Sequence, residues 1–104
     1  MNGEMIRFPI RPPFPAASEG EPTSRSSMRF IELPNDYIDK SFEYDHRRRL
    51  TVLTMKTKYP DGRPMEYHHY FSPELPEKEM QSFVLQTYLS TREHMGRNFI
   101  SAIR

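Results

Sequence analysis

The chain has 104 residues, and its 15 lysines and arginines against 14 aspartates and glutamates give a formal net charge of +1. This length allows one small domain, and a charge so close to zero disfavours a protein that binds nucleic acid through bulk positive charge. There is no cysteine, which excludes disulfides and zinc–thiolate sites. No apolar run approaches the roughly 20 residues of a membrane span, and no signal-peptide pattern is present. We therefore expect a cytoplasmic protein that does not bind membranes.

Residues 1–27 differ in composition from the rest of the chain, because five of the ten prolines lie there. Proline lacks an N–H and has a fixed φ, so it interrupts helices and sheet ladders. We therefore expect 1–27 to be a proline-rich extended or disordered leader, followed by a small domain over 28–104. A second interpretation is a docking tail, since Phe8, Ile10 and Phe14 alternate with prolines and could fill pockets on a partner protein.

Four segments of the domain have strand patterns. The apolar run 28–33 is either an edge strand or the last part of the leader. Residues 41–45 alternate aromatic and polar side chains with the period of two that indicates a half-buried strand, and Leu50–Lys58 is rich in β-branched residues. An Asp-Gly pair then provides the positive φ of a tight hairpin, and 65–71 is the next strand.

A helix is expected directly after the last strand. Ser72, Pro73 and Glu74 form a typical helix start, with a capping oxygen, a proline in the first turn and an acidic residue near the positive end of the helix dipole. Thr91 is a candidate cap for a second short helix, which Gly96 would interrupt. The predicted buried stripe of the first helix consists of Met80, Phe83, Val84, Thr87 and Tyr88.

These elements predict an α+β fold, a small antiparallel sheet of three to four strands with one or two C-terminal helices packed on one face. The apolar stripe of the helix is assigned to the core rather than to a ligand site, and Phe83 is expected to be buried between helix and sheet.

The four histidines form no metal-binding or catalytic pattern. His68 and His69 are neighbours on a predicted strand, so their side chains point to opposite faces and cannot readily share a metal. His46 beside Asp45 is expected to be a solvated pair in a turn rather than a catalytic dyad. No catalytic triad order, phosphate loop or dinucleotide fingerprint is present. We therefore expect no metal, no cofactor, no small-molecule substrate and no enzyme activity.

The basic residues form a more informative cluster, because three consecutive arginines lie in one predicted turn and aromatic side chains follow on the strands beside it. Arginines can hold phosphates while bases stack on exposed aromatics. The alternative is an ordinary solvated surface, in which nearby glutamates pair with these cations. The candidate nucleic-acid-binding residues are Arg47, Arg48, Arg49, Lys56, His68 and Tyr70.

Several short motifs resemble the KTSC domain, a family of small modules found at the C-terminus of some lysyl-tRNA synthetases and as stand-alone bacterial and phage proteins. The matching positions are Tyr44-Asp45, Leu50-x-Val52, Tyr70, Gly96-x-x-Phe99 and Ile103-Arg104. The sequence departs from the family at His68, where the first tyrosine of the central Tyr-x-Tyr motif is expected. The resemblance implies little chemistry beyond the RNA binding that has been proposed for the family.

Two functions remain open from the sequence. One is a non-enzymatic protein-interaction or assembly module, for example a phage or bacterial accessory protein acting on a host protein, with Phe8, Ile10 and Phe14 as the contact residues. The other is an RNA or single-stranded nucleic-acid-binding module that uses the basic turn and the central aromatics.

Overall fold

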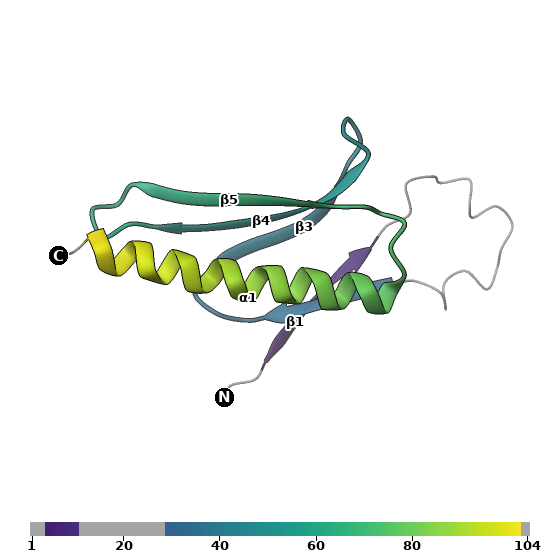
Figure 1. Ribbon diagram of the computed structural model, residues 1–104, viewed down its shortest axis with the longest axis horizontal. Coiled ribbons are helices and arrows are strands. Elements are labelled where there is room, and N and C mark those ends of the chain that lie inside the picture. Colours follow the sequence, from purple (N-terminus) through teal and green to yellow (C-terminus); the bar gives the residue numbers. More distant parts are fainter. Residues whose placement is uncertain (1–3, 11–28, 103–104) are drawn as a thin grey trace, which may run out of the picture.

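The computed structural model describes residues 4–10 and 29–102, and in that part of the chain five strands precede one long helix (Figure 1). The elements are β1 (Met5–Ile10), β2 (Arg29–Pro34), β3 (Asp39–Asp45), β4 (Leu50–Lys58), β5 (Pro64–Phe71) and α1 (Glu77–Ala102). The strands form two antiparallel sheets, one of β1 and β2 and the other in the order β3-β4-β5. The predicted α+β class is confirmed.

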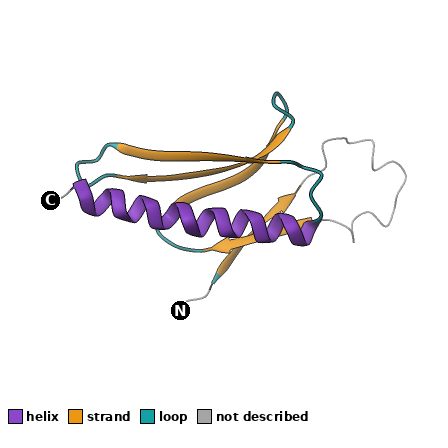
Figure 2. Ribbon diagram, in the orientation of Figure 1, coloured by secondary structure: helices purple, strands orange, loops and turns teal. Residues whose placement is uncertain are grey.

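Helix α1 runs along one side of the molecule and contacts β2 of the small sheet and β5 of the large one (Figures 1 and 2). Side chains from both sheets and from the helix therefore meet in one core. The residues without any solvent exposure are Ile31, Leu33, Leu53, Met55, Met80, Val84 and Tyr88.

Strand β4 explains why the large sheet has one buried face and one open face. Leu53 and Met55 are buried against the helix side, whereas Val52, Thr54 and Lys56 alternate with them and point the other way. Successive side chains of a strand lie on opposite faces. Because β4 is the central strand, its apolar half fixes which face of the whole sheet is covered.

The hairpin between β4 and β5 closes as the Asp-Gly pair predicts. The Tyr59 N–H donates to the Arg63 carbonyl at 2.8 Å, and the Gly62 N–H donates to the Tyr59 carbonyl at 2.9 Å. Gly62 has a φ of +93°, a conformation that glycine adopts without a steric cost.

Strand β1 differs from the expectation for the leader. It lies within 1–27, yet it pairs along its whole length with β2, opposite Arg29–Pro34. Ile10 is only 4% exposed, and Phe8 packs against the core. Pro9 is tolerated in the strand because its backbone nitrogen faces away from β2, where no N–H is needed for the ladder. The alternation of Ile6, Phe8 and Ile10 has the period of two of a strand, but the prolines led to the prediction of a leader. Phe14 lies outside the described residues.

The free edge of β2 is covered by α1. The side-chain amide of Gln81 pairs with the backbone of Glu32, accepting from its N–H at 2.6 Å and donating to its carbonyl at 2.9 Å. The Glu77 carboxylate lies 3.5 Å from the Phe30 N–H. Side chains of the helix therefore hydrogen-bond to the backbone groups of β2 with which another strand could otherwise pair.

The helix starts later than predicted. The Ser72 hydroxyl accepts from the Glu74 N–H at 3.2 Å, but this bond belongs to a turn. Pro76 disfavours the helical conformation at the residue before it, Leu75. The helix therefore begins after this proline, at Glu77. The Met80 N–H donates to the Pro76 carbonyl at 2.8 Å.

Two expectations about the helix interior were wrong. Helix α1 continues through Gly96 to Ala102, so there is no second helix in the described residues. Phe83 is 47% exposed, because it lies about 100° around the helix from its buried neighbour Val84. The buried stripe consists of Met80, Val84, Tyr88, Thr91 and Met95.

A partly buried ionic cluster joins the loop between the sheets to the helix. The Asp36 carboxylate accepts hydrogen bonds from the Tyr88 hydroxyl at 2.7 Å, Arg92 Nη1 at 2.8 Å and Lys40 Nζ at 3.0 Å. The Lys40 side chain is only 3% exposed. Burial raises the pKa of Asp36, but its hydrogen bonds from Tyr88, Arg92, Lys40 and the Ile38 N–H outweigh that effect and leave the pKa below its ordinary value.

Core position and helix phase are tested together by two alanine substitutions. Leu53→Ala should lower the free energy of unfolding by about 2–5 kcal/mol, because it leaves a cavity in the core. Phe83→Ala should lower it by about 1 kcal/mol or less, because the ring is half exposed. Urea denaturation of both variants measures the difference, and equal losses would contradict the helix phase.

The ionic cluster is tested by removing its carboxylate. Asp36→Asn leaves Lys40 buried without a counter-charge and should cost about 3–5 kcal/mol. The double variant Asp36→Asn/Lys40→Met should recover part of this loss because the unpaired charge is gone. Asp61→Asn, which breaks an exposed ion pair of 2.8 Å with Arg63, is the control and should leave the melting temperature close to that of the wild type, because exposed ion pairs contribute little to stability. If thermal melts gave Asp36→Asn the same melting temperature as the wild type, the stabilising role of the Asp36 carboxylate would be refuted.

Candidate functional site

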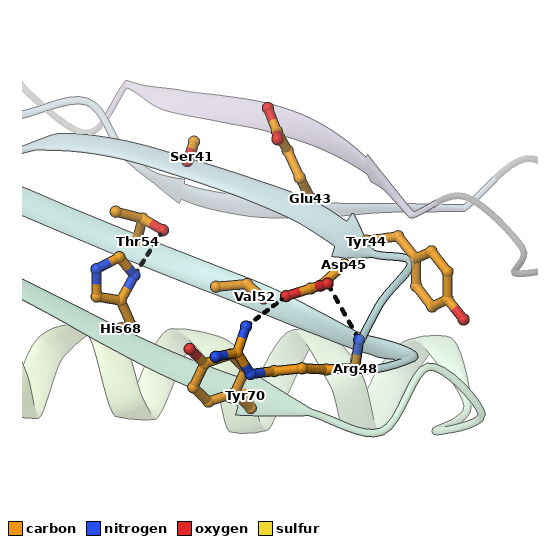
Figure 3. Close-up of a pocket in the computed structure, with 9 residues that line it drawn as sticks. All are labelled: Ser41, Glu43, Tyr44, Asp45, Arg48, Val52, Thr54, His68 and Tyr70. Carbon is orange, nitrogen blue, oxygen red and sulfur yellow. Dashed lines mark hydrogen bonds and ion pairs between the residues drawn. The ribbon is translucent and has the colours of Figure 1, made fainter.

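The face of β3-β4-β5 turned away from α1 is the candidate site, and we call it the outer face. Figure 3 views this face with the helix behind the sheet. No described segment covers it in that view. A depression of about 480 Å³ lies over the three strands near the β3–β4 turn. Its lining residues are Ser41, Glu43, Tyr44, Asp45, Arg48, Val52, Thr54, His68 and Tyr70.

Asp45 organises the basic turn. Its Oδ1 atom accepts from the backbone N–H groups of Arg47 at 2.9 Å and Arg48 at 3.1 Å, and its carbonyl accepts from the Arg49 N–H at 2.7 Å. Hydrogen bonds from the backbone and then the side chain of Arg48 lower the pKa of Asp45. Arg49 has a φ of 58°, the left-handed region that costs a residue with a side chain roughly 1–2 kcal/mol.

Arg48 connects the turn to β5. Its Nη1 atom lies 2.9 Å from Asp45 Oδ2, and its guanidinium carbon lies 5.3 Å from the centre of the Tyr70 ring (Figure 3). Hydrogen bonding to Asp45 raises the pKa of Arg48. Tyr70 is 44% exposed, so the ring also presents surface to solvent. At this distance the arginine cation is attracted to the face of the aromatic ring.

A second chain of polar contacts crosses the middle of the face. His68 Nδ1 lies 3.3 Å from the Thr54 hydroxyl, and His68 Nε2 lies 2.7 Å from Glu66 Oε2. At the end of the sheet away from the β3–β4 turn is a second depression, of about 380 Å³. It is lined by Tyr37, Asp39, Lys56, Thr57, Lys58, Pro64, Met65 and Glu66.

The structure brings the predicted basic and aromatic candidates together. Arg48, Lys56, His68 and Tyr70 line the outer face, and Arg47 and Arg49 are exposed in the turn beside it. The predicted protein-binding residues are elsewhere: Ile10 is in the core and Phe8 packs against it. In the free chain, the side chains of Phe8 and Ile10 therefore contribute to the core and not to a binding surface.

The carboxylates of the site were not among the candidate binding residues predicted from the sequence. Asp39, Glu43 and Asp45 alternate along β3 and share the outer face with Glu66 of β5. The period-two pattern of 41–45 was the signal, since every residue opposite in phase to Phe42 must point outward. The outer face therefore carries charges of both signs.

The inner side of β5 is a structural interface with the helix. His69 Nε2 lies 2.9 Å from the Thr91 hydroxyl, and Asn98 Nδ2 donates to the Tyr67 hydroxyl at 3.0 Å. The ring of His94 packs edge-on against Tyr67, with centroids 5.7 Å apart. Among residues 4–10 and 29–102, no cluster of three or more side chains could hold a metal ion.

Comparison of the chain with protein-family models, with curated proteins and with solved structures finds no match. Within the described segments, α1 is too polar to cross a bilayer, and no other helix is present to do so.

The helix–β5 interface predicts a pH dependence of stability. Burial lowers the pKa of His69 from 6.5, and the neighbouring His68 lowers it further. The folded chain therefore favours neutral His69. Its contribution to the free energy of unfolding should be complete above pH 6.5 and should decrease as the pH falls toward the lower folded pKa. Urea midpoints at several pH values should show the wild type losing stability faster than His69→Gln, and parallel profiles would contradict this.

Proposed function

We propose that this chain is a non-enzymatic protein-binding module that docks a partner protein on the outer face. The observation that carries the proposal is the composition of this face: none of residues 4–10 and 29–102 covers it, one depression lies over it and a second lies at its end, and its cations and carboxylates are interleaved. In this proposal the chain acts in the cytoplasm as an accessory or assembly protein, for example one encoded by a phage and directed at a host protein.

The charges favour a protein over a polyanion. Arg48 is paired with Asp45, and His68 is within hydrogen-bond distance of Glu66. A nucleic-acid backbone laid across the face would meet the carboxylates of Asp39 and Glu43 as well as the lysines. A protein surface can match both signs at once, and such complementarity gives specificity and register.

The aromatic residues supply anchors for such a partner. Tyr70 is 44% exposed at one end of the face and Tyr37 is 67% exposed at the other. Tyrosine and arginine dominate binding energy at protein interfaces because they combine a large contact area with hydrogen-bonding groups. Both depressions therefore have a residue suited to a central contact.

A nucleic-acid-binding function is the second candidate, and a specific contact favours it. Arg48 stacks on Tyr70 at 5.3 Å, while Arg47, Arg49, Lys56 and the turn remain exposed on the same side. Single-stranded RNA could stack a base on Tyr70 while the arginines hold phosphates. The proposed membership of the KTSC family would also fit this alternative.

The two functions are separated by purification of tagged protein from native lysate with and without nuclease. Under the protein-binding proposal, Tyr70→Ala should weaken capture of a specific protein about tenfold or more, as for a tyrosine anchor, and nuclease should have no effect. Gln86→Ala, on the exposed side of α1, is the matched control and should behave like the wild type.

Nuclease-sensitive capture would instead support the nucleic-acid function. In that case, replacing Arg47, Arg48 and Arg49 with alanine should reduce the log–log salt slope of binding by about 0.7–0.9 per lost phosphate contact. Capture that is unchanged by Tyr70→Ala and insensitive to nuclease would overturn the use of the outer face for either function.

A further inference from the structure

The outer edge of β5 is an open row of backbone hydrogen-bonding groups. The bond from Tyr59 N–H to Arg63 sets the phase of the β4–β5 ladder, in which Tyr67 pairs with Met55 and His69 with Leu53. Alternate residues of an antiparallel strand bond to the same neighbour. Tyr67 and His69 therefore bond to β4, and the N–H and C=O groups of the residues between them point away from β4.

Three residues make up this edge, namely Glu66, His68 and Tyr70. In the part of the chain that the structure describes, no strand pairs with β5 on this side, and Figure 3 shows only α1, behind the sheet. No hydrogen bond from another segment reaches these backbone groups within residues 4–10 and 29–102. An exposed strand edge of this kind is a ready site for pairing with another chain.

The other sheet edges are protected differently. Gln81 covers the edge of β2 with two hydrogen bonds. Strand β1 carries Pro9 at a position that points outward, which removes a donor from its edge. Strand β3 contacts β1 of the small sheet. On β5 the only proline, Pro64, is the first residue, so the donors of Glu66, His68 and Tyr70 remain available.

We propose that two copies of this chain pair antiparallel through their β5 edges and form a continuous six-stranded sheet. A two-fold axis makes each copy present the same edge to the other, so no second sequence is required. Antiparallel pairing also continues the pattern of the three described strand pairs.

The polar side chains along β5 favour one register, with the two-fold axis at Tyr67. Glu66 then lies opposite His68 of the second copy, and His68 opposite its Glu66. A carboxylate and an imidazole that face each other directly across antiparallel strands can hydrogen-bond, and such cross-strand pairs stabilise a sheet. At both ends of the paired segment, the exposed ring of Tyr70 lies against Pro64 of the second copy, which adds apolar contact.

This pairing would join the two outer faces side by side, because Glu66, His68 and Tyr70 belong to both the edge and the outer face. Each copy would add its Glu66 beside the His68 of the other. The inference concerns the free protein and does not depend on any partner, so it is tested separately from the proposed function.

The first experiment measures the mass and the amide exchange of the free protein. The monomer is 12.4 kDa. In sedimentation equilibrium the mass should rise to twice this value as the protein concentration is raised to about 1 mM, which covers a weak but specific association. Hydrogen exchange by NMR should show the Glu66, His68 and Tyr70 amides gaining protection as concentration rises. The Tyr67 and His69 amides should be protected at all concentrations.

Two substitutions at one residue separate the backbone from the side chain. His68→Pro removes the outward N–H and should leave a folded monomer, because proline is tolerated where a strand edge faces solvent. His68→Ala retains the N–H and should still form the dimer. If His68→Pro does not fold, amide exchange of the wild type decides the question without it.

A charge exchange tests the register. His68→Glu places like charges opposite each other twice and should weaken self-association roughly 2- to 30-fold. Adding Glu66→Lys should restore it. A wild-type monomer at 1 mM would overturn the proposal. So would a dimer whose Glu66, His68 and Tyr70 amides exchange freely, since it would have to form through another surface such as the exposed side of α1.

Discussion

The arrangement of the molecule depends on the carboxylate of Asp36. It lies in the loop between the two sheets and receives hydrogen bonds from Lys40 at the start of β3 and from Tyr88 and Arg92 of the helix. Burial raises the pKa of Tyr88 far above its ordinary value, and the hydrogen bond to Asp36 raises it further, so the hydroxyl stays a donor. One negative charge therefore holds three elements together. A misplaced helix would take away the two donors that Tyr88 and Arg92 provide to this carboxylate, and a buried charge that loses its partners is costly.

The apolar core is small, and polar contacts determine where the helix lies on it. Gln81 is fixed to the backbone of β2, Thr91 to His69, and Asn98 to Tyr67. These contacts lie at the start, middle and end of α1 and touch both sheets. Apolar burial has no preferred direction, whereas hydrogen bonds have a narrow geometry. The polar contacts thus select one position of the helix among those that would bury a similar area.

With the helix fixed on the inner side, the outer face of β3-β4-β5 remains uncovered by any described segment, and its properties follow from strand alternation. Charged and polar side chains of three strands gather there, with Tyr70 and Tyr37 at the two ends. The open edge of β5 continues this face. In the part of the chain that the structure describes, this surface is open and ends at an unpaired strand edge, which suits it to binding either a partner protein or a second copy of the chain.

Local sequence patterns determined the strands β3, β4 and β5, the hairpin at Gly62 and the α+β class, because period-two alternation and turn chemistry act within a few residues. Three features depended on contacts between distant residues. Pairing with β2 made Met5–Ile10 a strand although it lies in the proline-rich part of the chain, and the phase of α1 left Phe83 exposed while Tyr88 became buried. The cluster around Asp36 joins residues more than 50 positions apart. Sequence alternation predicts that a strand has two faces, but only the packing of the helix decides which of them remains open for binding.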